Sequence, residues 1–281
     1  MSKERSDLTI RRILVAMDAS QHSQAALDAA ANVAALLDAE LVGMFIEDIN
    51  LLRVAQLPFV REVSFPVAET REIDVGKMEK YWRMQATLAR RQLIELANQK
   101  KIEWSFYIER GSVSDRLLTA SLDMDLLAIG RLGRSLSRPI SLGSTARTVL
   151  ERGKLSLLLM QNEVDLDQPI SVVFDGSHTA FRALKIASSL AQRSGSLRVL
   201  VWADDLKLAQ RYKSQIVDQL REEELEISYR RFYPDEDDSA VDVLQASNSC
   251  LLIIGVEDSK LTEGTIPRLL ERIEVALFII R

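Results

Sequence analysis

The sequence predicts an α/β protein built from two tandem Rossmann-like domains, each with an open parallel sheet flanked by helices. Three observations support this class. Short apolar segments alternate with amphipathic segments along the chain, which is typical of parallel βαβ units. The same order of segments occurs twice. The chain has 281 residues, a length that suits two domains of about 140 residues better than one.

The internal repeat predicts where the two domains lie. Three pairs of segments carry it: RILVAMDAS at 12–20 and PISVVFDGS at 169–177, Ala26-Leu27 and Ala183-Leu184, and DLLAIG at 125–130 and CLLIIG at 250–255. The repeat predicts one full domain at 1–162 and a shorter, degenerate one at 168–281. A short acidic linker joins them.

In the first copy, apolar segments predict strands at 12–17, 41–46, 103–108, 126–130 and 155–160. Amphipathic segments predict helices at 20–38, 76–99, 112–121 and 143–152. In the first of these helices, apolar residues recur at spacings of three and four from Ala26 to Leu37, and Ser20 is a suitable N-cap. The segment before Gly130 is continuously apolar, which indicates a strand buried on both faces.

In the second copy, strands are expected at 170–174, 197–202, 226–232, 251–254 and 275–280, with helices at 178–193, 205–222, 239–247 and 264–272. Strands that alternate with helices form parallel sheets through right-handed crossovers. Ligands of such sheets bind beyond the carboxyl ends of the strands, where the strand order reverses. Asp18 and Gly130 both stand at predicted strand ends, so we expect them at that edge.

Composition excludes several classes of function. Hydrophobic residues make up 47% and charged residues 27% of the chain, and the net charge is −5. No apolar segment approaches the ~18 residues of a membrane span, and mild acidity argues against nucleic acid as a partner. The polar N-terminus and the single cysteine, Cys250, lead us to expect a cytoplasmic protein without disulfides. Cys250 is expected to be a small core residue.

A glycine motif follows the fourth predicted strand. It reads Gly130-Arg131-Leu132-Gly133, then nine residues, then Gly143-Ser144-Thr145. Glycines allow close approach of backbone N–H groups to a phosphate, and a helix N-terminus adds partial positive charge. From 126 to 150 there are four arginines and no acid, which suits a polyphosphate. The alternative is an ordinary surface loop with solvated arginines.

These residues resemble the universal stress protein family in its tandem two-domain form. Its nucleotide-binding members carry G-x2-G-x9-G-[S/T] after the fourth strand and an Asp at the end of the first. The resemblance implies five-stranded sheets of order 3-2-1-4-5 and an ATP site, with or without Mg²⁺. It also implies that the two domains pair through their last strands, 155–160 and 275–280, as an intramolecular pseudo-dimer.

The resemblance also implies individual site residues. Adenosine is expected near Ala16, Asp18, Phe45 and Ile129. The phosphates are expected near Gly130, Arg131, Gly133, Gly143, Ser144 and Thr145. Two of these have alternative roles: Asp18 suits a local turn before the helix, and Phe45 suits the core.

The second copy departs from the motif. After Gly255, the position of the second glycine is taken by Asp258, the spacing to the next glycine is shorter, and three acids lie in between. A carboxylate about 4 Å from a phosphate costs about 1–4 kcal/mol. We therefore expect the second copy to bind no ATP and to act as a packing partner.

Residues 48–75 are expected to form a long irregular segment that leaves the same edge of the sheet. A loop of this length within a compact domain is usually functional or disordered, and this one is too apolar for disorder. It is interpreted as a lid over the nucleotide or as a docking arm for a protein partner or a second copy. The alternative is a flap that closes over its own domain.

The sequence therefore predicts an ATP-binding stress-response regulator whose nucleotide binds in the first domain only, with slow hydrolysis at most. There is no P-loop motif, and no residues are assigned to catalysis or to a metal. Two alternatives stay open at this point. One is an interaction scaffold that binds no nucleotide, and the other is a slow adenine-nucleotide hydrolase.

Overall fold

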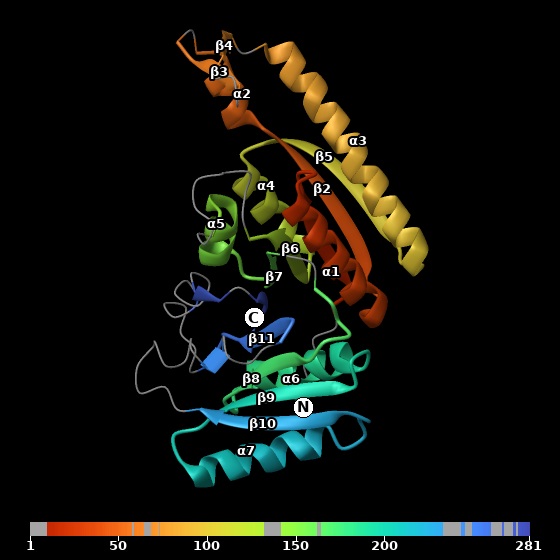
Figure 1. Ribbon diagram of the computed structural model, residues 1–281, viewed down its shortest axis with the longest axis vertical. Helices are drawn as coiled ribbons and strands as arrows, with labels where there is room; N and C mark the ends of the chain where they lie inside the picture. The colour runs from red at the N-terminus through yellow and green to blue at the C-terminus, as the bar shows by residue number, and fades with distance from the viewer. Residues whose placement is uncertain are drawn as a thin grey trace, which may run out of the picture.

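The fold is a continuous sheet that carries helices on both faces (Figure 1). The computed structural model describes residues 10–57, 59–64, 69–72, 74–131, 142–161, 164–232, 243–244, 249–259, 266, 272–273 and 275–281. The first half contains β1 (Arg12–Met17), α1 (Gln21–Leu37), β2 (Glu40–Asp48), α2 (Ile49–Ala55), β3 (Arg61–Ser64), β4 (Glu69–Glu72), α3 (Val75–Lys100), β5 (Trp104–Gly111), α4 (Val113–Ala120), a 3-10 turn (Ser121–Asp123), β6 (Leu126–Gly130), α5 (Ser144–Arg152) and β7 (Ser156–Met160). The second half contains β8 (Ile170–Phe174), α6 (His178–Ala191), β9 (Ser196–Trp202), α7 (Leu206–Gln219), β10 (Glu226–Phe232), β11 (Leu251–Gly255) and β12 (Ala276–Ile280).

Each predicted strand is confirmed to within three residues of its expected bounds, as are the predicted helices before residue 233. Helix α1 begins where the sequence predicts, because the Ser20 side chain accepts a hydrogen bond from the backbone N–H of Ser23 at 3.2 Å. The two helices expected at 239–247 and 264–272 lie mostly outside the described residues.

The strand order is β10-β9-β8-β11-β12-β7-β6-β1-β2-β5 in one ten-stranded sheet. Each half therefore has the expected order 3-2-1-4-5, with parallel pairing throughout. The halves join at β7 and β12, which pair antiparallel with Leu158 opposite Phe278. This confirms the predicted pairing of the two last strands. It also covers two apolar strands that would otherwise be exposed sheet edges.

Two layers of core lie on opposite faces of this sheet. Along β1, Ile13 and Val15 face the layer formed with α1 and α3, whereas Leu14 faces the layer formed with α4 and α5. The same alternation continues across the seam between the halves, where Leu158 and Phe278 share the first of these layers. A strand with apolar side chains on both faces must be covered on both faces, which fixes the helix–sheet–helix arrangement.

Arginines also join the two halves. The Arg131 side chain donates to the backbone carbonyl of Ile273 in the second half. In the opposite direction, the Arg281 side chain donates to the carbonyls of Leu150, at 2.5 Å, and Gly153 at the end of α5. A cation at a helix C-terminus satisfies carbonyls that have no intrahelical partner. The second half thus holds the C-terminal end of α5.

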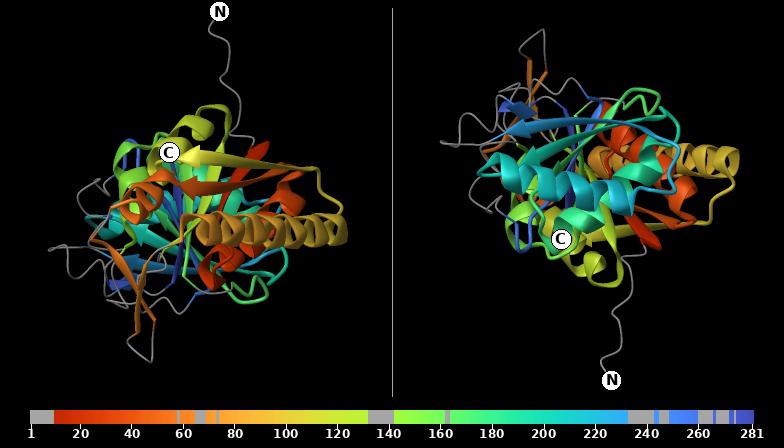
Figure 2. Two further views of the ribbon diagram at one scale, coloured as in Figure 1. Left: turned by 90° about the horizontal axis from the view of Figure 1, so that it is seen from above. Right: turned by 90° about the horizontal axis from the view of Figure 1, so that it is seen from below.

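The segment at 48–75 is not irregular, so that prediction is wrong. It contains the short helix α2, capped by Asp48, and the β3–β4 hairpin, which projects beyond the main sheet (Figures 1 and 2). The segment is rich in apolar residues, yet several of the described ones are exposed to solvent. The Phe59 side chain is 76% exposed.

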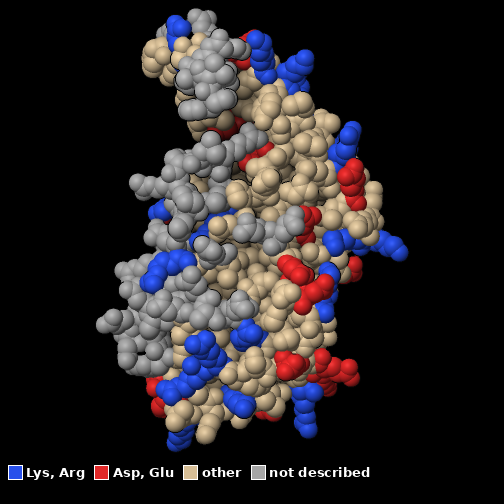
Figure 3. Space-filling view, viewed as in Figure 1, with Lys and Arg blue, Asp and Glu red and all other residues tan. Residues whose placement is uncertain are grey.

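The described surface carries charges of both signs. On the face seen in Figure 3, basic and acidic side chains are interspersed over both halves. Among the helices of the described residues, none is both long and apolar enough to cross a bilayer.

Candidate functional site

A cavity of about 340 Å³ opens at the carboxyl ends of the first-half strands. It lies where the strand order reverses, between β1 and β6, as expected for an open parallel sheet. Its walls come from the ends of β1, β2 and β6, from α2, α3 and α4, and from the start of α5. Eight predicted site residues line it: Ala16, Asp18, Phe45, Ile129, Gly130, Gly143, Ser144 and Thr145. The volume suits a small organic ligand.

The first turn of α5 forms part of the wall of this cavity. The first three residues of the helix, Ser144, Thr145 and Ala146, all line it. Intrahelical bonding begins only with Arg147, whose N–H donates to the Gly143 carbonyl at 2.9 Å, so the three preceding N–H groups have no acceptor within the helix. Because the N-cap is a glycine, no side chain caps them either. The start of α5 is therefore suited to an anion.

The two described glycines of the motif have different structural roles. A Cβ on Gly130 would lie 2.9 Å from the Cβ of His22, so this glycine allows β6 to pack closely against α1. Gly255 has the same role in the second half, where a Cβ would lie 2.7 Å from the backbone carbon of Thr179. The Gly143 N–H donates to the Arg131 carbonyl at 2.9 Å and is used inside the loop.

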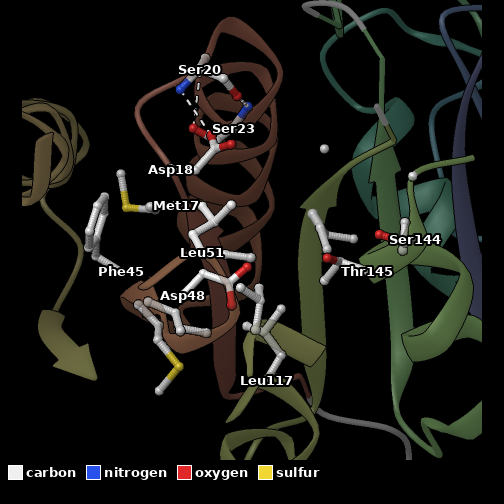
Figure 4. A pocket seen from close by; sticks show the side chains of 18 of the residues that line it. Met17, Asp18, Ser20, Ser23, Phe45, Asp48, Leu51, Leu117, Ser144 and Thr145 are labelled. Atoms are coloured by element: carbon white, nitrogen blue, oxygen red, sulfur yellow. Dashed lines mark hydrogen bonds between the residues drawn. The ribbon is translucent and has the colours of Figure 1, made fainter. Parts of the chain in front are cut away.

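Asp18 forms the local turn that the sequence offered as its alternative role. One of its carboxylate oxygens accepts from the Ser20 N–H at 3.0 Å, just before α1. Figure 4 shows Asp18 and Ser20 on one side of the cavity and Ser144 and Thr145 on the opposite side. A second carboxylate, Asp48, also lines the cavity, and it accepts from the Asn50 N–H at 2.9 Å. These two carboxylates are the only charged side chains among the described lining residues.

Arg131 does not line the cavity. Its side chain is 2% exposed and donates to Gln161 at 3.3 Å and to Ile273, and its backbone N–H donates to Met160 at 2.6 Å. These bonds direct it into the seam between the halves rather than toward the ligand space, contrary to the role that the motif indicated. Gly133, Arg134 and Arg138 lie outside the described residues.

Sequence reasoning missed part of the wall. Trp82 from α3 and Leu51 from α2 close the cavity, together with Met44, Val113 and Leu117. The Trp82 side chain is almost completely buried. It belongs to a regular amphipathic pattern along α3, which does not distinguish a residue facing a cavity from one facing the core. Asp48 and Leu51 bring the start of the inserted segment into the wall.

The corresponding edge of the second half is filled by its own side chains. The Asp258 carboxylate accepts from the N–H groups of His178 and Thr179, at 3.0 and 3.4 Å, at the start of α6. The counterpart of Asp18, Asp175, accepts from the Ser259 hydroxyl at 2.7 Å. The ring of Tyr212 packs against Gly176, the residue that follows Asp175. A Cβ added to Gly176 would lie 2.3 Å from this ring. At this edge, the N–H groups at the start of α6 and the Asp175 carboxylate therefore already have hydrogen-bond partners within the second half.

Metal-ligating side chains are dispersed in the described part of the protein. Within the described ranges, His, Cys, Asp and Glu side chains nowhere gather in the threes that would hold a metal ion. Among the described residues, the cavity presents an apolar floor, two carboxylates near the strand ends and, opposite them, helix N–H groups that have no acceptor within α5.

The two halves each contain a doubly wound parallel sheet, and together they define a tandem α/β protein with a cavity at the carboxyl edge of its first half. The sequence model of the universal stress protein family matches residues 9–161, and the chain belongs to this family. Among curated proteins, none matches the sequence.

Solved structures share the tandem fold. A universal stress protein from Archaeoglobus fulgidus DSM 4304 is similar, with 17% identity, coverage of 96% of this chain and 98% of that chain, and a TM-score of 0.69. A putative universal stress protein from Pseudomonas aeruginosa UCBPP-PA14 has 14% identity, coverage of 97% and 94%, and a TM-score of 0.63. A functionally unknown protein from Pseudomonas aeruginosa PAO1 has 13% identity, coverage of 97% and 93%, and a TM-score of 0.62. Because both chains are covered almost completely, the two-domain arrangement is shared.

The single cysteine lies outside the cavity and is expected to be unreactive. Burial raises the pKa of the Cys250 thiol from 9.0 to about 11. Because the thiolate is the reactive form, the native thiol should react with iodoacetamide at pH 8 on the order of a hundredfold more slowly than the unfolded thiol. Mass spectrometry in buffer and in denaturant measures both rates, and equal rates would contradict the burial. The raised pKa also means that Cys250 reduces stability as the pH rises from about 9 to 11, since the unfolded thiol ionises first.

Proposed function

We propose that the first half binds an adenine nucleotide, best ATP with or without Mg²⁺, and that the protein is a nucleotide-responsive regulator with little hydrolysis. The observation that carries the proposal is the start of α5. Three N–H groups without intrahelical acceptors line a cavity whose opposite side is apolar and carries Asp18. The phosphates would lie on Ser144, Thr145 and Ala146, where the helix dipole favours negative charge.

The base and ribose would occupy the other side of the cavity. Phe45, Ile129 and Trp82 supply apolar and aromatic surface for a purine. Asp18 and Asp48 are suited to accept hydrogen bonds from ribose hydroxyls or from an amino group of the base. Their charges also disfavour phosphates on this side, which supports one orientation of the ligand. We leave Arg131 out of the contacts because its side chain is engaged in the seam.

We propose that the second half binds no nucleotide. The Asp258 carboxylate already receives the N–H groups at the start of α6, and a phosphate would have to displace it. Asp175 is likewise bonded to Ser259. The second half then serves to pair with the first through β7 and β12, and Arg281 holds α5 from its far end.

Calorimetric titration of the full chain with ATP tests the proposal. We expect one ATP per chain with a Kd below about 1 mM, and a change in tryptophan fluorescence that disappears in Trp82→Phe but not in Trp202→Phe. Trp202 is a matched control because it packs against Phe232, away from the cavity. Absence of binding would favour the scaffold alternative. Turnover well above about one per minute, lost in Asp18→Ala, would favour the hydrolase alternative.

A further inference from the structure

Helix α3 carries a line of six exposed side chains, which we call its outer line. They stand at positions 77, 81, 84, 88, 91 and 95, and all six are exposed. The positions recur at alternating spacings of four and three residues, which is the spacing of the contact line in a coiled coil. The buried residues of α3, Trp82 and Leu93 among them, follow a separate line. The described part of the chain therefore leaves the outer line open to solvent.

The middle of the outer line is apolar. Tyr81, Met84 and Leu88 are 45%, 58% and 43% exposed, so each keeps about half of its surface in water. Residues at these spacings are neighbours on one face of a helix. Single exposed apolar residues are normal on a protein surface, whereas contiguous ones indicate an interaction surface. Figure 1 shows α3 along the outer side of the first half, away from the second half.

The two ends of the outer line carry opposite charges. Lys77 stands near the N-terminal end of α3, and Glu95 stands near its C-terminal end. The Lys77 ammonium lies 3.7 Å from the Asp74 carboxylate, but both groups are exposed, and such a pair contributes little. Lys77 and Glu95 are 18 positions apart, which is about 27 Å along a helix. These two side chains therefore cannot pair within one chain.

The outer line is complementary to itself when a second copy of α3 runs antiparallel to the first. With the midpoint at position 86, every residue of the line meets another residue of the line. The opposed pairs are Lys77 with Glu95, Tyr81 with Arg91, and Met84 with Leu88. Two-fold symmetry makes each pair occur twice. Two of the pairs bring opposite charges together or place a guanidinium on an aromatic ring, and the third is apolar.

The charges distinguish this arrangement from its alternatives. A parallel pair of α3 helices would place Lys77 against Lys77 and Glu95 against Glu95, which is repulsive at both ends. An anionic lipid surface is the other occupant that an apolar line beside cations would fit. Such a surface would repel the Glu95 carboxylate, whereas Lys77 of a second copy would attract it. The pattern therefore favours an antiparallel second copy.

We propose that two copies of the chain associate through the outer line of α3, as an antiparallel helix pair with a two-fold axis near position 86. The apolar middle contributes burial of apolar surface, and the charged ends fix the direction of the second helix. A single helix pair is smaller than the interface of a permanent dimer. The dimer therefore dissociates on dilution.

Sedimentation equilibrium of the full chain from about 1 to 300 µM tests the proposal. We expect a monomer–dimer equilibrium with a Kd below about 100 µM. Met84→Asp places a charge in the apolar middle and should raise this Kd at least about tenfold. Val217→Asp is the matched control, because Val217 is a half-exposed apolar residue on α7, and it should leave the Kd unchanged. A chain that stays monomeric over the whole range would overturn the proposal.

A charge swap tests the antiparallel register. Lys77→Glu and Glu95→Lys should each raise the Kd about 3- to 10-fold, since each replaces two attractive contacts by two repulsive ones. The double variant should recover most of the affinity, because opposite charges meet again between the copies. Arg90→Glu is the control for a change of charge, since Arg90 is exposed on α3 but off the outer line, and it should leave the Kd unchanged.

Three outcomes of these measurements would contradict the helix pair. A double variant that associates no better than the single variants would exclude the antiparallel register. A dimer that none of the outer-line substitutions weakens would have its interface elsewhere. A monomeric chain that cosediments with vesicles of equal parts phosphatidylserine and phosphatidylcholine, and loses this binding in Met84→Asp, would assign the outer line to lipid.

Discussion

Replacing Ser144 by Asp is expected to lower the affinity for ATP about 5- to 1000-fold while the protein stays folded. The new carboxylate would stand at the first position of α5, beside the N–H groups that we propose hold the phosphates. At about 4 Å, repulsion between a carboxylate and one phosphate charge costs about 1–4 kcal/mol. An acid at a helix N-terminus is otherwise favourable, so the melting temperature without nucleotide should be equal or higher.

The matched control is Ser144→Asn, which has nearly the size of aspartate but no charge. Titrations of both variants with ATP, together with thermal unfolding, separate charge from shape. The Ser144→Asn variant should retain most of the affinity for ATP. Equal affinities for the aspartate and asparagine variants would show that no phosphate lies near the start of α5.

Replacing Phe278 by Ala is expected to lower the free energy of unfolding by about 3–5 kcal/mol. The Phe278 side chain is fully buried on β12 opposite Leu158, at the seam where the two halves form one sheet. Removing it leaves a cavity in a core layer that both halves share. The substitution lies in the second half, but it should therefore destabilise the first half as well.

Urea unfolding in a Trp202→Phe background, where the remaining tryptophans Trp82 and Trp104 both lie in the first half, measures this effect when it is followed by tryptophan fluorescence and by far-UV circular dichroism. Phe59→Ala is the control, because that side chain is largely exposed on the inserted segment, and it should change stability by less than about 0.5 kcal/mol. If Phe278→Ala left the tryptophan transition unchanged, the two halves would unfold independently and the seam would not couple them.

The sequence was most informative where local pattern decides structure. Strands such as β6 and β7 are buried on both faces and appear as continuous apolar segments, and Ser20 marks the start of α1. The repeat and the resemblance predicted the strand order and the antiparallel seam. The cavity residues at strand ends were also predictable, because the carboxyl ends of parallel strands meet at one edge.

What the sequence could not predict depends on contacts between distant residues. Arg131 stands in an acid-free glycine motif, yet it bonds to a carbonyl 142 residues away. Trp82 follows the ordinary periodicity of α3, and only packing brings it to the cavity. Helix α2 within 48–75 was missed because apolar residues of this segment, Val54 and Phe59 among them, are exposed rather than core-forming.

A crystal structure of the full chain grown with excess ATP is the most direct test of the proposed function. We predict a nucleotide in the first half, with phosphate oxygens at hydrogen-bond distance, about 3 Å, from the N–H groups of Ser144, Thr145 and Ala146. The Asp258 carboxylate should remain on the start of α6. Nucleotide bound only at α6, or no bound nucleotide in either half, would contradict the account.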